Sequence, residues 1–303
     1  MGGYFGGRLA QSGEEVVFIA RGKHLQAMKD NGLKIDSISG DFIVKPVQVT
    51  DNPEEVGIVD MVLVGVKAWQ VSDAAAVMGP MIGPQTFVLP LQNGVEAASH
   101  LAAVLGQDHV LGGLCGLFSY IVEPGHICHV GADPFIRFGE LDNRPSDRVE
   151  RLRKAFERTS GISVTIPSNI HVALWQKFVF VTAFSGIGAV TRSPVGIFRS
   201  LPGSRKMLEQ TIFEICNVAR AYGIDLPENV VDKTMDFFDA LPSNGTASMQ
   251  RDIMDGRASE LVKQYGGVGR LGKVVIVESR VYSFFFYLLV PIESLAGGQI
   301  SFV

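Results

Sequence analysis

The chain has 303 residues, which exceeds a usual single domain of about 100–200 residues and predicts two domains. Its 27 Lys and Arg against 31 Asp and Glu give a net charge of −4, a balance that argues against binding to nucleic acid or to an anionic membrane surface. Three scattered cysteines are too few for a disulfide framework, which indicates a reducing compartment. We therefore expect a cytoplasmic protein and leave an organelle open.

Strand and helix patterns alternate through the first half of the chain. Expected strands are short apolar runs at 16–20, 59–66 and 86–91. Expected helices lie between them, at 25–31, 69–78 and 96–105. Such alternation indicates parallel βαβ units and predicts a Rossmann-like, doubly wound α/β sheet. Three further runs, separated by Pro and Gly, predict an antiparallel edge of the same sheet: 110–122, 126–131 and 135–140.

The second half of the chain is mainly helical by pattern. A helix at 147–160 and a last strand at 162–166 complete the first domain, which we place at 1–168. From about residue 170 the patterns predict an all-helical C-terminal domain, 169–303, with helices at 171–190, 205–222, 227–241, 248–255 and 259–271. The apolar run at 281–290 is shorter than the ~20 residues of a membrane span and predicts a core helix.

The N-terminus begins with a glycine-rich helix start, Gly2-Gly3-Tyr4-Phe5-Gly6-Gly7, which leads into the strand at 16–20. Dinucleotide-binding folds place G-x-G-x-x-G between the first strand and the first helix, where the glycines let a pyrophosphate approach the helix N-terminus. Only the tail of that motif is present here, with Gly2 as its third glycine. We therefore expect that the first strand and the first two glycines are missing from this chain.

Cationic and amide side chains follow three of the expected strands. Arg21 ends the strand at 16–20, where an acidic residue would suit NAD and an arginine suits the extra phosphate of NADP. Lys67 follows the strand at 59–66, and Asn93 follows the one at 86–91. Singly, each cation is better explained as a solvated loop residue. Together the three positions indicate a ligand site at the carboxyl edge of a parallel sheet.

Sequence blocks along nearly the whole chain resemble the ketopantoate reductase (2-dehydropantoate 2-reductase) family. They are Gly2 to Leu9, Val66-Lys67-Ala68-Trp69-Gln70, Leu91-Gln92-Asn93-Gly94-Val95-Glu96, Trp175-Gln176-Lys177-Phe178 and Ala247-Ser248-Met249-Gln250-Arg251-Asp252, continued by Gly256-Arg257 and Glu260. The resemblance implies NADPH-dependent reduction of the 2-keto group of 2-dehydropantoate to pantoate, in the synthesis of pantothenate and coenzyme A. The partner it implies is a small 2-keto acid, and a homodimer is possible.

The resemblance also implies roles for individual residues. Lys177 matches the family's catalytic lysine, the general acid, and Glu260 matches the acidic residue beside it. Asn93 matches a residue that contacts both cofactor and substrate, and Ser248 one that holds the substrate carboxylate. Ser185 falls on a further substrate position. The cofactor positions are Gly2, Gly3, Arg21, Lys67, Asn93 and Glu260.

Elementary chemistry supports part of this assignment. Hydride arriving at a ketone carbon leaves charge on the oxygen, which needs a proton or a cation nearby, and a lysine supplies both. Lys177 is a lone cation in an apolar helix, where an ammonium is costly unless it is paired or reaches solvent. Simpler explanations are a snorkelling surface lysine for Lys177, a first-turn helix acid for Glu260 and an N-cap for Ser248.

Several features depart from the family pattern and keep alternatives open. Val181 and Ser185 stand where the family often has asparagines, and the segment 274–279 replaces a Gly- and Pro-containing stretch. One alternative is therefore a reductase of another small 2-keto acid. Another, suggested by the missing strand, is a catalytically silent binding protein. We expect no metal site at His126, Cys128 and His129, because His129 points to the opposite face of a strand from the other two.

Overall fold

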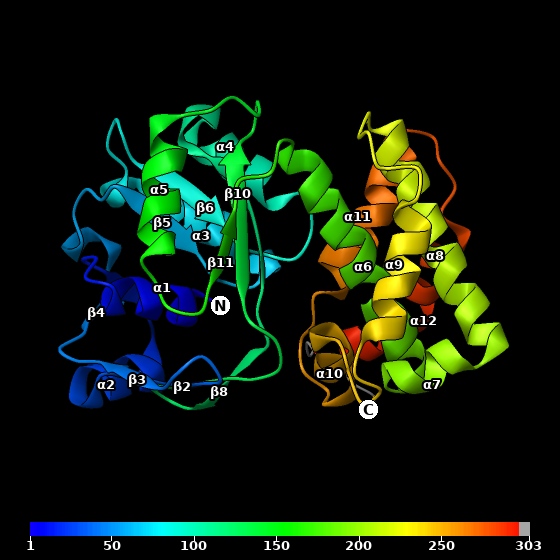
Figure 1. Cartoon of the computed structure of the whole chain (residues 1–303), viewed down its shortest axis with the longest axis horizontal. Coiled ribbons are helices and arrows are strands. Elements are labelled where there is room, and N and C mark those ends of the chain that lie inside the picture. Colours follow the sequence, from blue (N-terminus) through cyan, green and yellow to red (C-terminus); the bar gives the residue numbers. More distant parts are fainter. Residues whose placement is uncertain (297–303) are drawn as a thin grey trace. The chain divides into compact units, whose positions relative to one another are not determined.

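The computed structural model describes residues 1–296 and divides into two compact units (Figure 1). The first unit comprises Met1–Gln92 and Glu96–Ile170, and the second comprises Asn93–Val95 and the chain from His171 onward. The first unit contains all the strands of the described residues, and helices alone make up the second. The predicted α/β domain with parallel strands, followed by an all-helical domain, is confirmed. The functional boundary at 168/169 stays a prediction.

Parallel ladders form the main part of the first unit. β1 (Val17–Ile19) pairs with β4 (Gln48–Thr50), and β5 (Met61–Val64) pairs with β6 (Phe87–Pro90). An isolated parallel bridge from Val88 to Val110 leads on to a three-stranded sheet in which β10 lies between β7 and β11. These strands are β7 (Leu111–Gly116), β10 (Phe135–Glu140) and β11 (Ser163–Thr165). Apolar runs buried on both faces, such as β6, are typical of parallel sheets covered by helices.

The predicted antiparallel edge is wrong in part. β7 and β10 do pair antiparallel, but the run at 110–122 breaks after Gly116. The next two strands, β8 (Ser119–Glu123) and β9 (His126–His129), belong to a separate sheet of order β3-β2-β9-β8. That sheet exists because of two strands that the sequence analysis missed, β2 (Leu33–Ser37) and β3 (Phe42–Val44). β9 pairs with β2 in parallel, so the hairpin of β8 and β9 belongs to this separate sheet.

The helices of the first unit cover these strands. They are α1 (Gly2–Gln11), α2 (Gly22–Asn31), α3 (Val71–Val77), α4 (Ala97–Leu105) and α5 (Asp147–Glu157). In α1 the glycines allow close packing: a Cβ on Gly3 would lie 2.6 Å from Ile127, and one on Gly7 would lie 2.5 Å from Ile35. The glycine-rich start is thus explained partly by packing of α1 against β2 and β9.

Two strands of the first unit keep an unpaired edge. Among the described residues, β1 hydrogen-bonds only to β4, and β5 only to β6. The expectation that a strand is missing ahead of α1 stays a prediction.

Seven helices make up the described part of the second unit (Figure 1). They are α6 (Ile170–Thr191), α7 (Val195–Ser200), α8 (Pro202–Ala221), α9 (Val230–Ala240), α10 (Ser248–Met254), α11 (Leu261–Val274) and α12 (Arg280–Ala296). The predicted helices are recovered to within a few residues, and α7 was missed because six residues are too few to show a period. Their buried faces form one apolar core.

By length and composition, α6 could cross a membrane, with a mean hydropathy of 1.3 over its most apolar window. However, 72% of that window is buried inside the structure, as in the core helix of a globular domain. The segment predicted as a core helix at 281–290 is only half buried. Tyr282, Phe285 and Leu289 of α12 face the core, whereas Phe284 and Tyr287 are exposed.

Candidate functional site

Two of the predicted site residues meet in the second unit. Asn93 Nδ2 lies 3.5 Å from Glu260 Oε2, at the outer limit of a hydrogen bond, although 167 residues separate the two in sequence. The segment before Asn93 is fixed by Gln92, whose amide nitrogen donates to the carbonyls of Val64 (2.8 Å) and Val66 (3.0 Å). These bonds fix the chain at the end of β6 and thereby help to position the next residue, Asn93.

Glu260 does not act as a stabilising first-turn acid of a helix. It precedes α11 as the N-cap residue, but its side chain makes no capping hydrogen bond, and the first turn of α11 contains no acid. The side chain is only 6% exposed. Its Oε2 instead accepts hydrogen bonds from Asn93 and from the amide nitrogen of Gln264, at 3.3 Å. A buried carboxylate held by two side-chain amides, rather than used to cap its helix, fits a functional role.

Close packing against α6 fixes the position of α11. The hydroxyl of Tyr265 donates to the carbonyl of Thr182 at 2.9 Å, and both residues are buried. Gly186 makes room for this ring, because a Cβ there would lie 1.4 Å from the Tyr265 hydroxyl oxygen. Burial raises the pKa of Tyr265, so the phenol stays protonated and donates. Glu260 therefore lies at the start of a helix that is closely packed against α6.

Lys177 lies in α6 and is half buried. It is the one Lys, Arg, Asp or Glu among the 22 residues of this helix. Its neighbours Trp175 and Phe178 are 5% and 2% exposed and pack edge to face, so they face the core. A half-buried lysine beside internal rings is consistent with the catalytic assignment and with a snorkelling lysine, so the catalytic role stays a prediction.

The predicted substrate residues differ in exposure. Ser248 is exposed and is the first residue of α10, while Ala247 occupies the N-cap position. The explanation of Ser248 as an N-cap is therefore wrong. Ser185 is 1% exposed, and its hydroxyl has no hydrogen-bond partner. Val181, four residues before Ser185 in the same helix, is half buried.

Three predicted cofactor residues gather at the start of α1 and the end of β5. Gly2 and Gly3 form the first turn of α1, where helix N–H groups lack partners within the helix. A Cβ on Gly65, just after β5, would lie 2.6 Å from the backbone of Gly2. Lys67 is exposed and caps the short helix that follows. The pKa of the Met1 α-amino group is lowered, mainly by burial and also by the nearby charge of Lys67.

Arg21 is exposed at the carboxyl end of β1, as predicted from the sequence pattern. It occupies the N-cap position of α2 in an extended conformation, and its side chain makes no capping hydrogen bond. An exposed guanidinium at the junction of a parallel strand and a helix start is well placed for an anionic group. Half-buried Gly2 and Gly3 offer backbone N–H groups, and exposed Lys67 and Arg21 offer positive charge, as the phosphates of a dinucleotide require.

The two histidines of β9 lie on opposite faces of the strand. His126 Nε2 lies 2.6 Å from Asp36 Oδ2, and the hydrogen bond from His126 lowers the pKa of that exposed carboxyl. His129 lies on the opposite, buried face and bonds to Ser37 and to the carbonyl of Ala132. Within the described part of the chain, no group of three or more His, Cys, Asp or Glu side chains could hold a metal ion.

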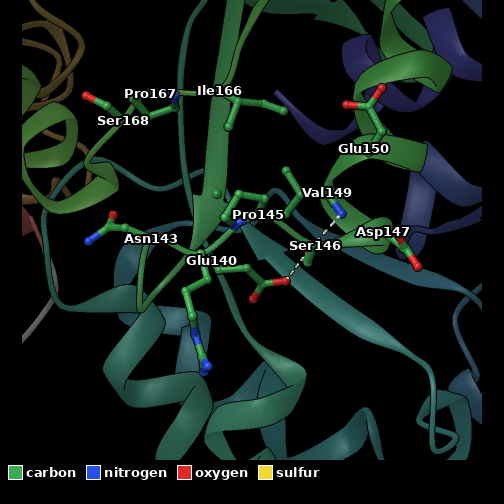
Figure 2. A pocket seen from close by; sticks show the side chains of 12 residues that line it. Glu140, Asn143, Pro145, Ser146, Asp147, Val149, Glu150, Ile166, Pro167 and Ser168 are labelled. Carbon is green, nitrogen blue, oxygen red and sulfur yellow. Dashed lines mark hydrogen bonds between the residues drawn. The ribbon is translucent and has the colours of Figure 1, made fainter.

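A pocket of about 480 Å³ in the first unit contains none of the predicted site residues. Figure 2 shows Asn143, Pro145 and Ser146 lining it opposite Ile166 and Pro167. Its carboxylate Glu140 is already paired with Arg148 at 2.6 Å. The pocket is therefore a hollow beside a structural ion pair, and nothing at it suggests chemistry.

Two models of one protein family match most of the chain. The family model described as ketopantoate reductase PanE/ApbA matches residues 1–143, and the model of its C-terminal part matches residues 169–293. The chain is 29% identical over 262 residues to the uncharacterized oxidoreductase YkpB of Bacillus subtilis (strain 168), covering 86% of this chain and 85% of that one.

Solved structures are similar as well. The crystal structure of 2-dehydropantoate 2-reductase from Geobacter metallireducens GS-15 has a TM-score of 0.89 at 31% identity and 95% coverage of both chains. The ternary structure of D-mandelate dehydrogenase with NADH and anilino(oxo)acetate shares the fold, with a TM-score of 0.89 at 22% identity, covering 98% of this chain and 96% of that one. The chain belongs to the ketopantoate reductase PanE/ApbA family of oxidoreductases.

Proposed function

We propose that this protein reduces the 2-keto group of a small 2-keto acid, with 2-dehydropantoate as the leading substrate and pantoate as its product. The observation that carries the proposal is the contact between Asn93 and Glu260, because it joins two residues that the family resemblance assigns to one site. The buried, oriented carboxylate and the single cation of α6 supply the charged groups that such a reaction needs.

NADPH is the cofactor we propose, and when bound it supplies the hydride. Exposed Arg21 supports a preference for the extra phosphate of NADP, and Lys67 and the N-terminus of α1 suit the remaining phosphates. Lys177 would hold a proton on Nζ and give it to the carbonyl oxygen as negative charge develops there. Glu260 would balance the charge of that ammonium, and Asn93 would orient the carboxylate of Glu260.

The substrate carboxylate would bind at Ser248, whose exposed hydroxyl at the first residue of α10 can donate a hydrogen bond. Ser185 is a second proposed donor, supported less directly because its hydroxyl is buried. A half-buried Val181 favours an apolar substituent on the substrate at that point, and so keeps another small 2-keto acid as the second candidate substrate.

The test is a steady-state assay of the purified protein that follows NADPH absorbance with 2-dehydropantoate and with 2-keto acids that lack its hydroxyl group. We expect turnover with 2-dehydropantoate and a lower KM for NADPH than for NADH. Turnover only with another acid would establish the second substrate. Cofactor binding without turnover on any acid would favour a silent binding protein. A homodimer also stays a prediction, and light scattering of the same sample measures it.

A further inference from the structure

Gln264 is a buried glutamine beside the Glu260 carboxylate. It lies one helical turn after Glu260, in α11, and is fully buried. Its Nε2 donates to Glu260 Oε2 at 3.3 Å, and its backbone N–H donates to the Glu260 carbonyl at 2.8 Å. The side chain therefore bonds to Glu260, the N-cap residue of α11, for which the family resemblance implies a catalytic role.

The Gln264 amide turns its NH₂ end toward Glu260, since Oε2 of Glu260 accepts the hydrogen bond from Nε2. The other end, Oε1, is buried and has no hydrogen-bond partner among residues 1–296. A buried, unsatisfied acceptor costs stability, and an apolar side chain of the same length would avoid that cost. Packing alone gives no reason for a glutamine at this position.

We propose that Gln264 is a positioning residue that holds the Glu260 carboxylate in its working rotamer. Asn93 and Gln264 donate to the same oxygen of Glu260, the first from a loop and the second from the helix that carries Glu260. Two donors on one oxygen fix both its position and the rotation of the carboxyl group, as an active-site group requires. The inference rests on the proposed function, since it assumes that Glu260 takes part in the reaction.

A structural role and a positioning role predict opposite results when the amide is removed. In Gln264→Met the side chain keeps its length and loses its N–H donor. If Gln264 only supports the fold, Tm falls and turnover of the folded protein is unchanged. If it positions Glu260, Tm stays the same or rises, while kcat falls by about ten- to a hundredfold.

A matched control is Thr234→Val in α9. Thr234 is a buried polar residue of the same unit, and its hydroxyl bonds only to the Val230 carbonyl of its own helix. This substitution should leave kcat unchanged. Gln264→Leu is the second variant, in case Gln264→Met fails to fold.

Two further measurements separate this inference from the function on which it rests. In a Glu260→Gln background, Gln264→Met should lower kcat no further, because Gln264 acts only through the carboxylate. A crystal structure of Gln264→Met should show Glu260 displaced from Asn93. An unmoved Glu260 with full turnover overturns the proposal. If Glu260→Gln itself keeps full activity, the assigned role of Glu260 fails, whereas the crystal structure still decides whether Gln264 positions it.

Discussion

Asn93 and Glu260 form a side-chain hydrogen bond of 3.5 Å between the loop after β6 and the start of α11. Neither residue needs the other to form its own element: the loop is held by Gln92, and α11 begins without a capping bond from Glu260. Because neither the loop nor the helix depends on this contact for its own structure, we interpret the contact as a feature of the site. The Glu260 carboxylate should therefore respond to a charge placed at position 93.

Replacing Asn93 by aspartate tests this contact. The two side chains have the same shape, but the substitution would place a second carboxylate about 3.5 Å from Glu260 and remove the donor. We expect kcat/KM to fall by about ten- to a hundredfold, as like charges rearrange the site. The control is Asn229→Asp, at the exposed N-cap of α9, where aspartate is equally favourable and activity should be unchanged. Wild-type kinetics for Asn93→Asp would remove this contact from the site.

Removing the ammonium of Lys177 should lower turnover far more than it lowers stability. In Lys177→Ala we expect kcat to fall by about two or more orders of magnitude, as for loss of a positioned acid. Tm should change little, because the ammonium lies in a largely apolar helix. Lys206→Ala, an exposed lysine of α8, is the control and should behave as wild type. Unchanged turnover in Lys177→Ala would assign this residue to the surface.

Arg21→Ala should weaken NADPH binding and leave NADH binding nearly unchanged. A charge-assisted bond to a phosphate contributes roughly 1.5–3 kcal/mol, or about ten- to a hundredfold in Kd. The comparison variant is Lys23→Ala, which removes an exposed cation two residues further along the same loop and helix start. Titrations of both cofactors measure the ratio. Equal loss of affinity for NADPH and NADH would show that Arg21 does not read the extra phosphate.

The sequence predicted the fold class well because helix and strand periods are local. It missed β2 although Leu33 and Ile35 alternate as buried residues there, and that omission led to the wrong sheet for β8 and β9. Sheet assignment depends on pairing between distant segments, which no local pattern contains. The contact between Gln264 and Glu260 could not be predicted from the sequence either. Their spacing of four residues allows two side chains on one face of a helix to meet, but packing against α6 decides which side chains of α11 face inward.

Glu140, which lines the pocket in Figure 2, forms an ion pair with Arg148 that predicts a pH-dependent stability. Burial raises the pKa of Glu140, but hydrogen bonds from Arg148 and Ser146 outweigh it, so the pKa lies below its ordinary value of 4.5. A lowered folded-state pKa means that the stabilisation is present above pH 4.5 and is lost as the pH falls through the folded-state pKa. Glu140→Gln should therefore have a lower Tm than wild type at neutral pH. In acid, where wild type has lost this stabilisation, the difference in Tm between the two proteins should be smaller. A gap that is the same at both pH values would contradict this.

Gly186→Ala should destabilise the second unit and also impair the site. In an open helix position, Gly→Ala stabilises by about 0.5–1 kcal/mol. At Gly186 the new Cβ would lie 1.4 Å from the Tyr265 hydroxyl oxygen and 2.1 Å from Cζ of its ring. The ring is buried and bonded to the Thr182 carbonyl, so it cannot turn away without moving α11.

We expect a net loss of about 1–3 kcal/mol in the free energy of unfolding, as for other overpacked cores. Turnover should fall as well, because α11 carries Glu260. Gly203→Ala in the first turn of α8 is the matched control: its Cβ would meet nothing within 4 Å, so stability should be kept or raised. Urea denaturation and the NADPH assay on both variants measure the two effects. If Gly186→Ala is as stable and as active as Gly203→Ala, then close packing of α6 against Tyr265 does not hold Glu260 in place.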